Sequence, residues 1–103
     1  PPSIADVREK IKVIERIKRA RGKLASGTRL LTSGQIDRMT EYKQELAKLN
    51  SEIAKASTDE QIRGLKLKRH EVKCNIEFLK DDELRLQRQA EAELERAERL
   101  WQS

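Results

Sequence analysis

The only histidine and the only cysteine of this chain stand four residues apart, as His70 and Cys74. On a helix they would share one face, where such a pair could bind a metal ion or supply a nucleophile. A zinc site needs three or four ligands, and no second cluster of ligands occurs in the sequence. A Cys–His nucleophile also needs an oxyanion hole, and no glycine-rich turn is placed to build one. We therefore interpret the pair as a partly exposed histidine beside a buried structural cysteine, and expect no catalysis, metal or cofactor.

A second set of residues that could bind a ligand is basic. The stretch "ERIKRARGKLASGTR", residues 15–29, has six basic side chains and one acid. Steps of four, three and four place four basic residues on one helix face: Lys12, Arg16, Arg19 and Lys23. This face has three interpretations: an ordinary solvated surface, a contact for an acidic protein, or a ridge that follows the phosphates of a nucleic acid. No aromatic residue is interleaved for base stacking, and no DNA-binding motif is present, so nucleic acid stays the alternative to a protein partner.

Further candidate contact residues stand in the second half of the chain. The segment "GLKLKRHEVK", residues 64–73, contains a second basic cluster with Lys66, Arg69 and Lys73. Leu86 and Trp101 lie on the apolar stripe of the last segment, and an exposed tryptophan often anchors a binding contact. We expect these two side chains to contact a partner.

Composition indicates long helices. Of the 103 residues, 40% are charged and only 3% aromatic, which is typical of coiled coils and not of a thick globular core. The formal net charge is +5, with a basic N-terminal third and an acidic C-terminal end. No apolar run is long enough to span a membrane, and a single cysteine favours a reduced, intracellular and cytoplasmic setting. The Pro-Pro start fits a fragment of a larger protein or loss of an initiator methionine.

Hydrophobic spacing predicts an all-α fold with three helices, at about residues 3–24, 34–56 and 58–101. Ser3 with Asp6 and Thr32 with Gln35 have the spacing of helix N-caps. For the third helix two capping boxes are possible, Ser57 with Glu60 and Thr58 with Gln61. The first stripe consists of Ile4, Val7, Ile11, Ile14, Ile17, Ala20 and Leu24. The second is a strict heptad seam of Met39, Tyr42, Leu46, Leu49, Ile53 and Ala56. The third combines Leu65, Val72, Leu79 and Leu86 with Ile62, Ile76, Ala90 and Ala97.

The third helix also carries a second apolar stripe, formed by Leu67, Cys74 and Phe78. This stripe widens the apolar face near the middle of the helix. A wider apolar face usually has two neighbouring helices in place of one, so we expect two neighbours here.

The connections predict how the helices pair. The short link after the second helix makes residues 35–80 an antiparallel hairpin. The third helix is about 65 Å long and the other two about 32 Å each, so the second helix covers only half of it. The first helix, within a basic segment at residues 3–34, then either closes a three-helix bundle over residues 58–80 or extends the hairpin along the other half. In the first arrangement residues 81–103 form a projecting acidic tail, which would need a partner or another copy to be stable. We expect one helical module, residues 1–103, with this tail.

Residues 35–88 resemble the Rho-effector homology repeats, which are antiparallel coiled-coil fingers in protein kinase C-related kinases. Here "KASTDEQ" is similar to the polar turn of that family, and Asn75, Ile76, Phe78 and Leu79 are similar to its Asn-apolar-x-aromatic-Leu core. The resemblance implies signalling through a Rho-type small GTPase bound on the exposed face of the hairpin. Lys66, Arg69 and Lys73 are the candidate contacts.

The sequence as a whole therefore predicts a non-catalytic protein–protein interaction module of the antiparallel coiled-coil type. A Rho-family small GTPase is the candidate partner. Two alternatives stay open, namely a basic helical protein that binds nucleic acid and a structural subunit that assembles through its third helix.

Overall fold

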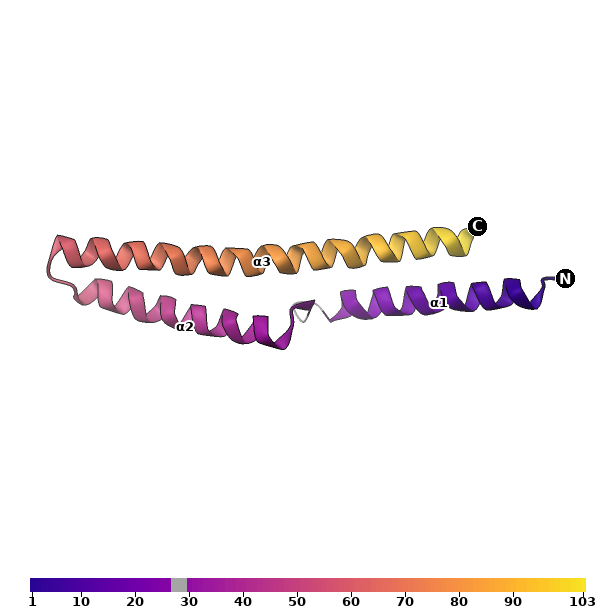
Figure 1. The fold of residues 1–103 in the computed structure, drawn as a ribbon, viewed down its shortest axis with the longest axis horizontal. Coiled ribbons are helices and arrows are strands. Elements are labelled where there is room, and N and C mark those ends of the chain that lie inside the picture. Colours follow the sequence, from indigo (N-terminus) through magenta and orange to yellow (C-terminus); the bar gives the residue numbers. More distant parts are fainter. Residues whose placement is uncertain (27–29) are drawn as a thin grey trace. The chain divides into compact units, whose positions relative to one another are not determined.

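The computed structural model describes residues 1–26 and 30–103, which form three α-helices (Figure 1). Helix α1 spans Ile4–Ala25, α2 spans Ser33–Lys55 and α3 spans Asp59–Gln102. The predicted all-α fold is confirmed, with each helix within a residue or so of its expected bounds. Part of the predicted loop at 25–34, residues 27–29, lies outside the described residues. In the described part of the chain, no helix contains an apolar stretch long enough to cross a membrane.

Capping boxes begin the first two helices. The Ser3 hydroxyl accepts the Asp6 backbone N–H at 3.1 Å, and the Asp6 carboxylate accepts the Ser3 N–H at 3.3 Å. Thr32 and Gln35 exchange the equivalent bonds at 3.2 and 2.9 Å. The first N–H groups of a helix have no partner within it, so these side chains determine where each helix begins.

Loss of the cap on α2 should have a measurable cost. We expect Thr32→Ala to lower the free energy of unfolding by about 1 kcal/mol, since it leaves the Gln35 N–H without its acceptor. Chemical denaturation measures this change. Thr40→Ala is the control, because the Thr40 hydroxyl donates to the Ile36 carbonyl inside the same helix and satisfies no terminal N–H. Equal losses in the two variants would contradict a specific capping role for Thr32.

The described residues group into two compact units. Unit 2, Leu31–Asp82, is a hairpin in which α2 lies antiparallel to the first part of α3 (Figure 1). Two contacts record its register: the Arg69 guanidinium donates to the Asn50 Oδ1 at 3.0 Å, and the Gln35 Nε2 lies 3.5 Å from the Asp82 Oδ2. Its core consists of Leu49, Val72 and Ile76, packed against Met39, Tyr42, Leu46 and Leu65. The predicted hairpin and the predicted seam of α2 are confirmed.

Unit 1, Pro1–Leu30 with Glu83–Ser103, pairs α1 with the C-terminal part of α3. Their antiparallel register shows in a 3.2 Å ion pair between Lys23 and Glu93 and in a 2.7 Å bond from the Lys10 ammonium to the Trp101 carbonyl. The prediction of a projecting acidic tail is therefore wrong for residues 83–103. The alternative arrangement, in which α1 extends the pairing along α3, is the one observed. The acidic end of α3 complements the basic α1, and pairing the two buries apolar residues on both.

The buried seam of unit 1 is narrow and rich in alanine. Its most buried side chains are Ala20, Ala90 and Ala97, each 1–2% exposed, together with Val13. The predicted stripe on α1 is only partly correct, because Val13 is buried in place of Ile4, Val7 and Ile11, which are exposed. Lys10 already lies level with Trp101 near the last turn of α3, so the first turns of α1 have no part of α3 beside them.

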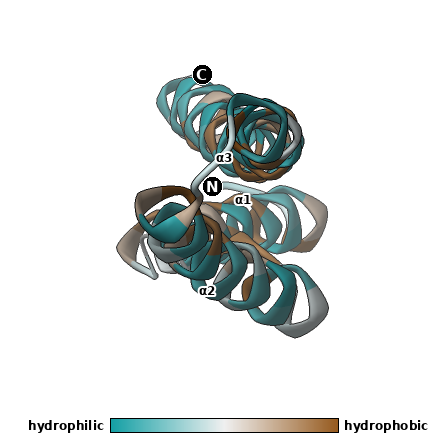
Figure 2. Cartoon of the chain, turned by 90° about the vertical axis from the view of Figure 1, so that its left-hand side faces the viewer, coloured by the Kyte–Doolittle hydropathy of each residue, from teal (hydrophilic) through white to brown (hydrophobic). Residues whose placement is uncertain are grey.

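The second apolar stripe of α3 is not covered in unit 2. Leu67 and Phe78 are 66% and 71% exposed, and Cys74 is half-buried. The expectation of two neighbours is therefore wrong here, because within unit 2, all of whose residues are described, α2 alone packs on this part of α3. In Figure 2 hydrophilic colour dominates the ribbons of α2 and α3, and hydrophobic colour is confined to part of each helix.

Candidate functional site

Several charged side chains of unit 1 line one hollow. Arg16, Arg19 and Lys23 of α1 line a hollow of about 490 Å³. Its other wall comes from α3 and consists of Glu93, Arg96, Ala97 and Leu100. We call this hollow the basic groove. Three of the four residues of the predicted basic ridge therefore lie together.

Lys12, the fourth residue of that ridge, does not line the basic groove. Its ammonium lies 3.5 Å from the Glu9 carboxylate on the exposed surface of α1. Salt bridges of this exposed kind contribute little to stability. Lys12 therefore has the same charge as the other three ridge residues but lies outside the groove.

The basic groove combines cations with an apolar floor. Four basic side chains surround one carboxylate, that of Glu93, which is already paired with Lys23 at 3.2 Å. Two apolar side chains, the buried Ala97 and the exposed Leu100, also line the groove, and we call them its apolar floor. Hydrogen bonds from guanidinium groups to carboxylates are among the stronger ones in proteins, and the apolar floor favours a ligand that also brings apolar surface. The groove can thus bind a ligand with carboxylates and an apolar side.

The charge of the two units differs. Unit 1 contains thirteen basic and eight acidic residues, whereas unit 2 contains ten of each. The whole formal charge of +5 therefore belongs to unit 1. A field of this sign attracts acidic partners and speeds their association.

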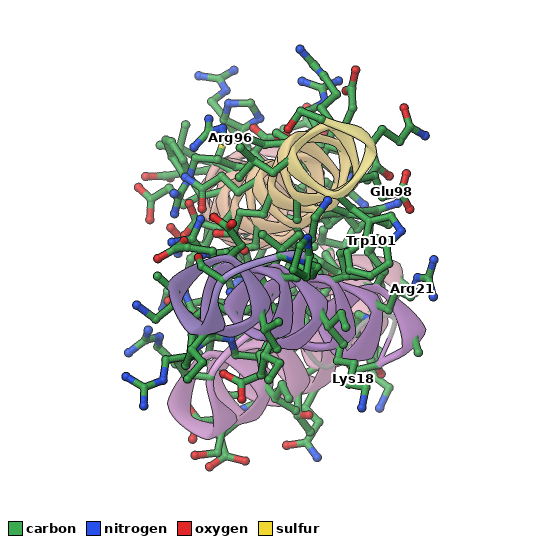
Figure 3. All side chains as sticks on the ribbon, turned by 90° about the vertical axis from the view of Figure 1, so that its right-hand side faces the viewer. Lys18, Arg21, Arg96, Glu98 and Trp101 are labelled. Atoms are coloured by element: carbon green, nitrogen blue, oxygen red, sulfur yellow. The ribbon has the colours of Figure 1, made fainter. Side chains whose placement is uncertain are left out.

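Trp101 lies away from the basic groove. Figure 3 shows Arg96 on one side of α3 and Trp101 with Glu98 on the other. Trp101 belongs to a second hollow, of about 370 Å³, which also includes Lys18 and Arg21. The Lys10 ammonium lies 4.9 Å from the centre of its ring, at a distance typical of a cation–π contact. Trp101 thus contacts α1, and its predicted role toward a partner stays a prediction.

The other predicted contact residues are dispersed. Leu86 is half-buried and lines a hollow of about 280 Å³ with Leu30 and Ala90. In unit 2, Lys66 and Lys73 are exposed, while Arg69 is bonded to Asn50 of α2. The hollow of Leu86 adjoins the basic groove, because Lys23 and Glu93 line both. The three basic residues of unit 2 do not line the groove.

The histidine and cysteine are adjacent, as their spacing predicts. The Cys74 sulfur lies 3.6 Å from the His70 Nε2. Cys74 is half-buried, whereas the sequence predicts a buried cysteine. Over residues 1–26 and 30–103, no three side chains of His, Cys, Asp or Glu come together as a metal site would require.

Arg96 is the one basic residue lining the groove that does not belong to the predicted ridge. It belongs to the acidic end of α3, where counting charge by segment hides a single arginine among the carboxylates. Its spacing to Leu100, four residues, was the available signal, because it places both side chains on one helix face. Comparison with family models, curated proteins and solved structures gives no significant match to this chain. The resemblance of residues 35–88 to the Rho-effector repeats therefore depends on those residues alone.

Proposed function

We propose that this chain is a non-catalytic protein-interaction module whose basic groove binds an acidic helical segment of a partner protein. The observation that supports it most is the convergence of Arg16, Arg19, Lys23 and Arg96 around an apolar floor. Ion pairs with these four basic side chains, which we call the rim of the groove, would orient such a segment. Burial of its apolar side against Ala97 and Leu100 would stabilise the complex.

The spacing of the rim favours a helical ligand. Arg16, Arg19 and Lys23 follow one another at three and four residues along α1, over about 10 Å. Carboxylates repeated at the same spacing on a second helix would meet them in register. A nucleic acid would gain little from the apolar floor. It would also find no aromatic residue among the side chains that line the groove.

Charge reversal within the basic groove tests this proposal. The probe is a fluorescent amphipathic helical peptide with glutamates three and four residues apart and leucines beside them, titrated at low salt. We expect Arg19→Glu and Arg96→Glu each to weaken binding about tenfold, because each replaces an attractive contact by a repulsive one. Lys12→Glu changes the net charge equally outside the groove and should bind like the unaltered chain.

Two outcomes would contradict the proposal. Equal weakening by Lys12→Glu would show that overall charge attracts the peptide and the groove does not. Random single-stranded RNA or duplex DNA gives the second comparison. If either bound more tightly than the peptide, with a steep salt dependence that Arg19→Glu reduces, the nucleic-acid alternative would replace the protein partner.

The resemblance of residues 35–88 makes a Rho-type GTPase the candidate partner for unit 2. Lys66 and Lys73 are exposed on α3 and available to an acidic surface. The test is binding of the GTPase loaded with GDP or with a non-hydrolysable GTP analogue. Nucleotide-dependent binding that is lost in Lys66→Glu/Lys73→Glu would support this partner. Absence of binding would remove it and leave the proposal for the basic groove as it stands.

A further inference from the structure

One surface of unit 2 is apolar and uncovered. Leu67, Cys74 and Phe78 follow one another at seven and four residues and so share one face of α3, which we call the far face. The side chains that pack toward α2, including Val72 and Ile76, lie roughly half a turn away around the same helix. In unit 2, α2 lies along one side of α3 only, which explains why Leu67 and Phe78 are 66% and 71% exposed (Figure 1).

Charged residues along one edge of the far face are arranged by sign. Arg63 and Lys66 stand toward its N-terminal end, and Glu77 and Asp81 toward its C-terminal end. All four are exposed. With 3.6 residues per turn, all four lie on the same edge of the stripe. This edge of the far face is thus basic at one end and acidic at the other.

We propose that the far face binds a second copy of this chain, with the two α3 helices antiparallel and a two-fold axis level with residues 72 and 73. In this arrangement Leu67 of one copy lies opposite Phe78 of the other, and every contact occurs twice. Arg63 lies opposite Asp81 of the second copy, and Lys66 lies opposite Glu77 of the second copy. Parallel pairing would instead place Arg63 beside Arg63 and Asp81 beside Asp81, which repel. The distribution of charge therefore selects the antiparallel pair.

Two features limit the strength of this association. Glu71 lies beside the far face and near the axis, so the two copies bring their Glu71 carboxylates close together. Glu77 also has a partner in its own helix, Lys80, at 3.7 Å. The apolar part of the contact is smaller than in a standard interface, which buries about 800 Å² per partner. We expect a dissociation constant on the order of 100 µM.

Sedimentation of the full chain, from about ten times below to ten times above that concentration, tests the association. We expect a concentration-dependent dimer that Arg63→Asp or Asp81→Arg weakens about tenfold. The double variant Arg63→Asp/Asp81→Arg should restore it, since it recreates both pairs with the signs exchanged. Glu71→Gln should strengthen it several-fold. These positions are exposed, and circular dichroism confirms that each variant keeps its helices.

A monomer at every concentration would overturn the proposal. So would weakening in both single variants without rescue in the double variant. Cross-linking then tests the register, in a Cys74→Ser background. Oxidation of a mixture of Leu67→Cys and Phe78→Cys chains should give the mixed disulfide faster than either chain alone gives its own. Faster disulfides within each single variant would show parallel pairing. No residue of the basic groove takes part, so binding of the acidic peptide fails or succeeds independently.

Discussion

Replacing Ile76 by alanine should lower the free energy of unfolding by about 2–5 kcal/mol, whereas the same replacement at Phe78 should cost less than about 1 kcal/mol. The two residues stand two positions apart on α3. Ile76 is 6% exposed and belongs to the core of unit 2, while Phe78 is 71% exposed. Truncation at Ile76 removes buried methyl groups and leaves a cavity, and truncation at Phe78 does neither. Burial therefore decides the difference.

Denaturant unfolding at low micromolar concentration measures both variants, since the proposed pairing through the far face is negligible there. The slope of unfolding free energy against denaturant should stay constant, so that the midpoints report stability. A cost at Phe78 equal to that at Ile76 would show that Phe78 is buried in the monomer and would contradict the orientation of α3 in unit 2.

Replacing Ala97 by leucine should destabilise unit 1 by about 1–3 kcal/mol, because a larger side chain at this almost fully buried position would overpack its neighbours. Ala97 is 2% exposed, and Ala20 on α1 is even more buried. A leucine there would push α1 away from α3 and separate Arg16 and Arg19 from Arg96. Ala92→Leu, at an exposed position of the same helix, is the matched control and should be near neutral.

Hydrogen exchange resolves this effect by unit. Amides of α1 should exchange faster in Ala97→Leu, those of α2 should not change, and the acidic peptide should bind less tightly. Equal effects of Ala92→Leu, or greater stability in Ala97→Leu, would be incompatible with a close alanine seam between α1 and α3.

Local features of the fold could be predicted because they depend on neighbours within a few residues. The side chains of Thr32 and Gln35 each accept the other's backbone N–H. Their three-residue spacing is visible in the sequence, so the start of α2 was predictable. Apolar residues of α2, including Leu46 and Leu49, follow one another in alternating steps of three and four residues. This spacing identified the face of α2 that meets α3. The polar link after α2 is too short for anything except an antiparallel hairpin.

Part of the basic groove was predictable for the same reason. Arg16, Arg19 and Lys23 lie on one α1 helix and share a face by their spacing alone. Arg96 joins them only because α1 lies against residues 83–103, and that pairing joins residues about seventy positions apart, as in the contact of Lys23 with Glu93. Spacing within one helix carries no information about such a contact.

The sequence by itself determined the three helices, their caps and the hairpin of unit 2, because those depend on backbone hydrogen bonds and on short-range periodicity. Only the tertiary structure decided which half of α3 receives α1, and that Val13 is buried in place of Ile4 and Val7. The physical reason is that α1 carries apolar residues over a wide arc, so several faces could bury a similar area. Close approach at Ala20, Ala90 and Ala97, with acidic residues of α3 opposite basic ones of α1, selects one of them.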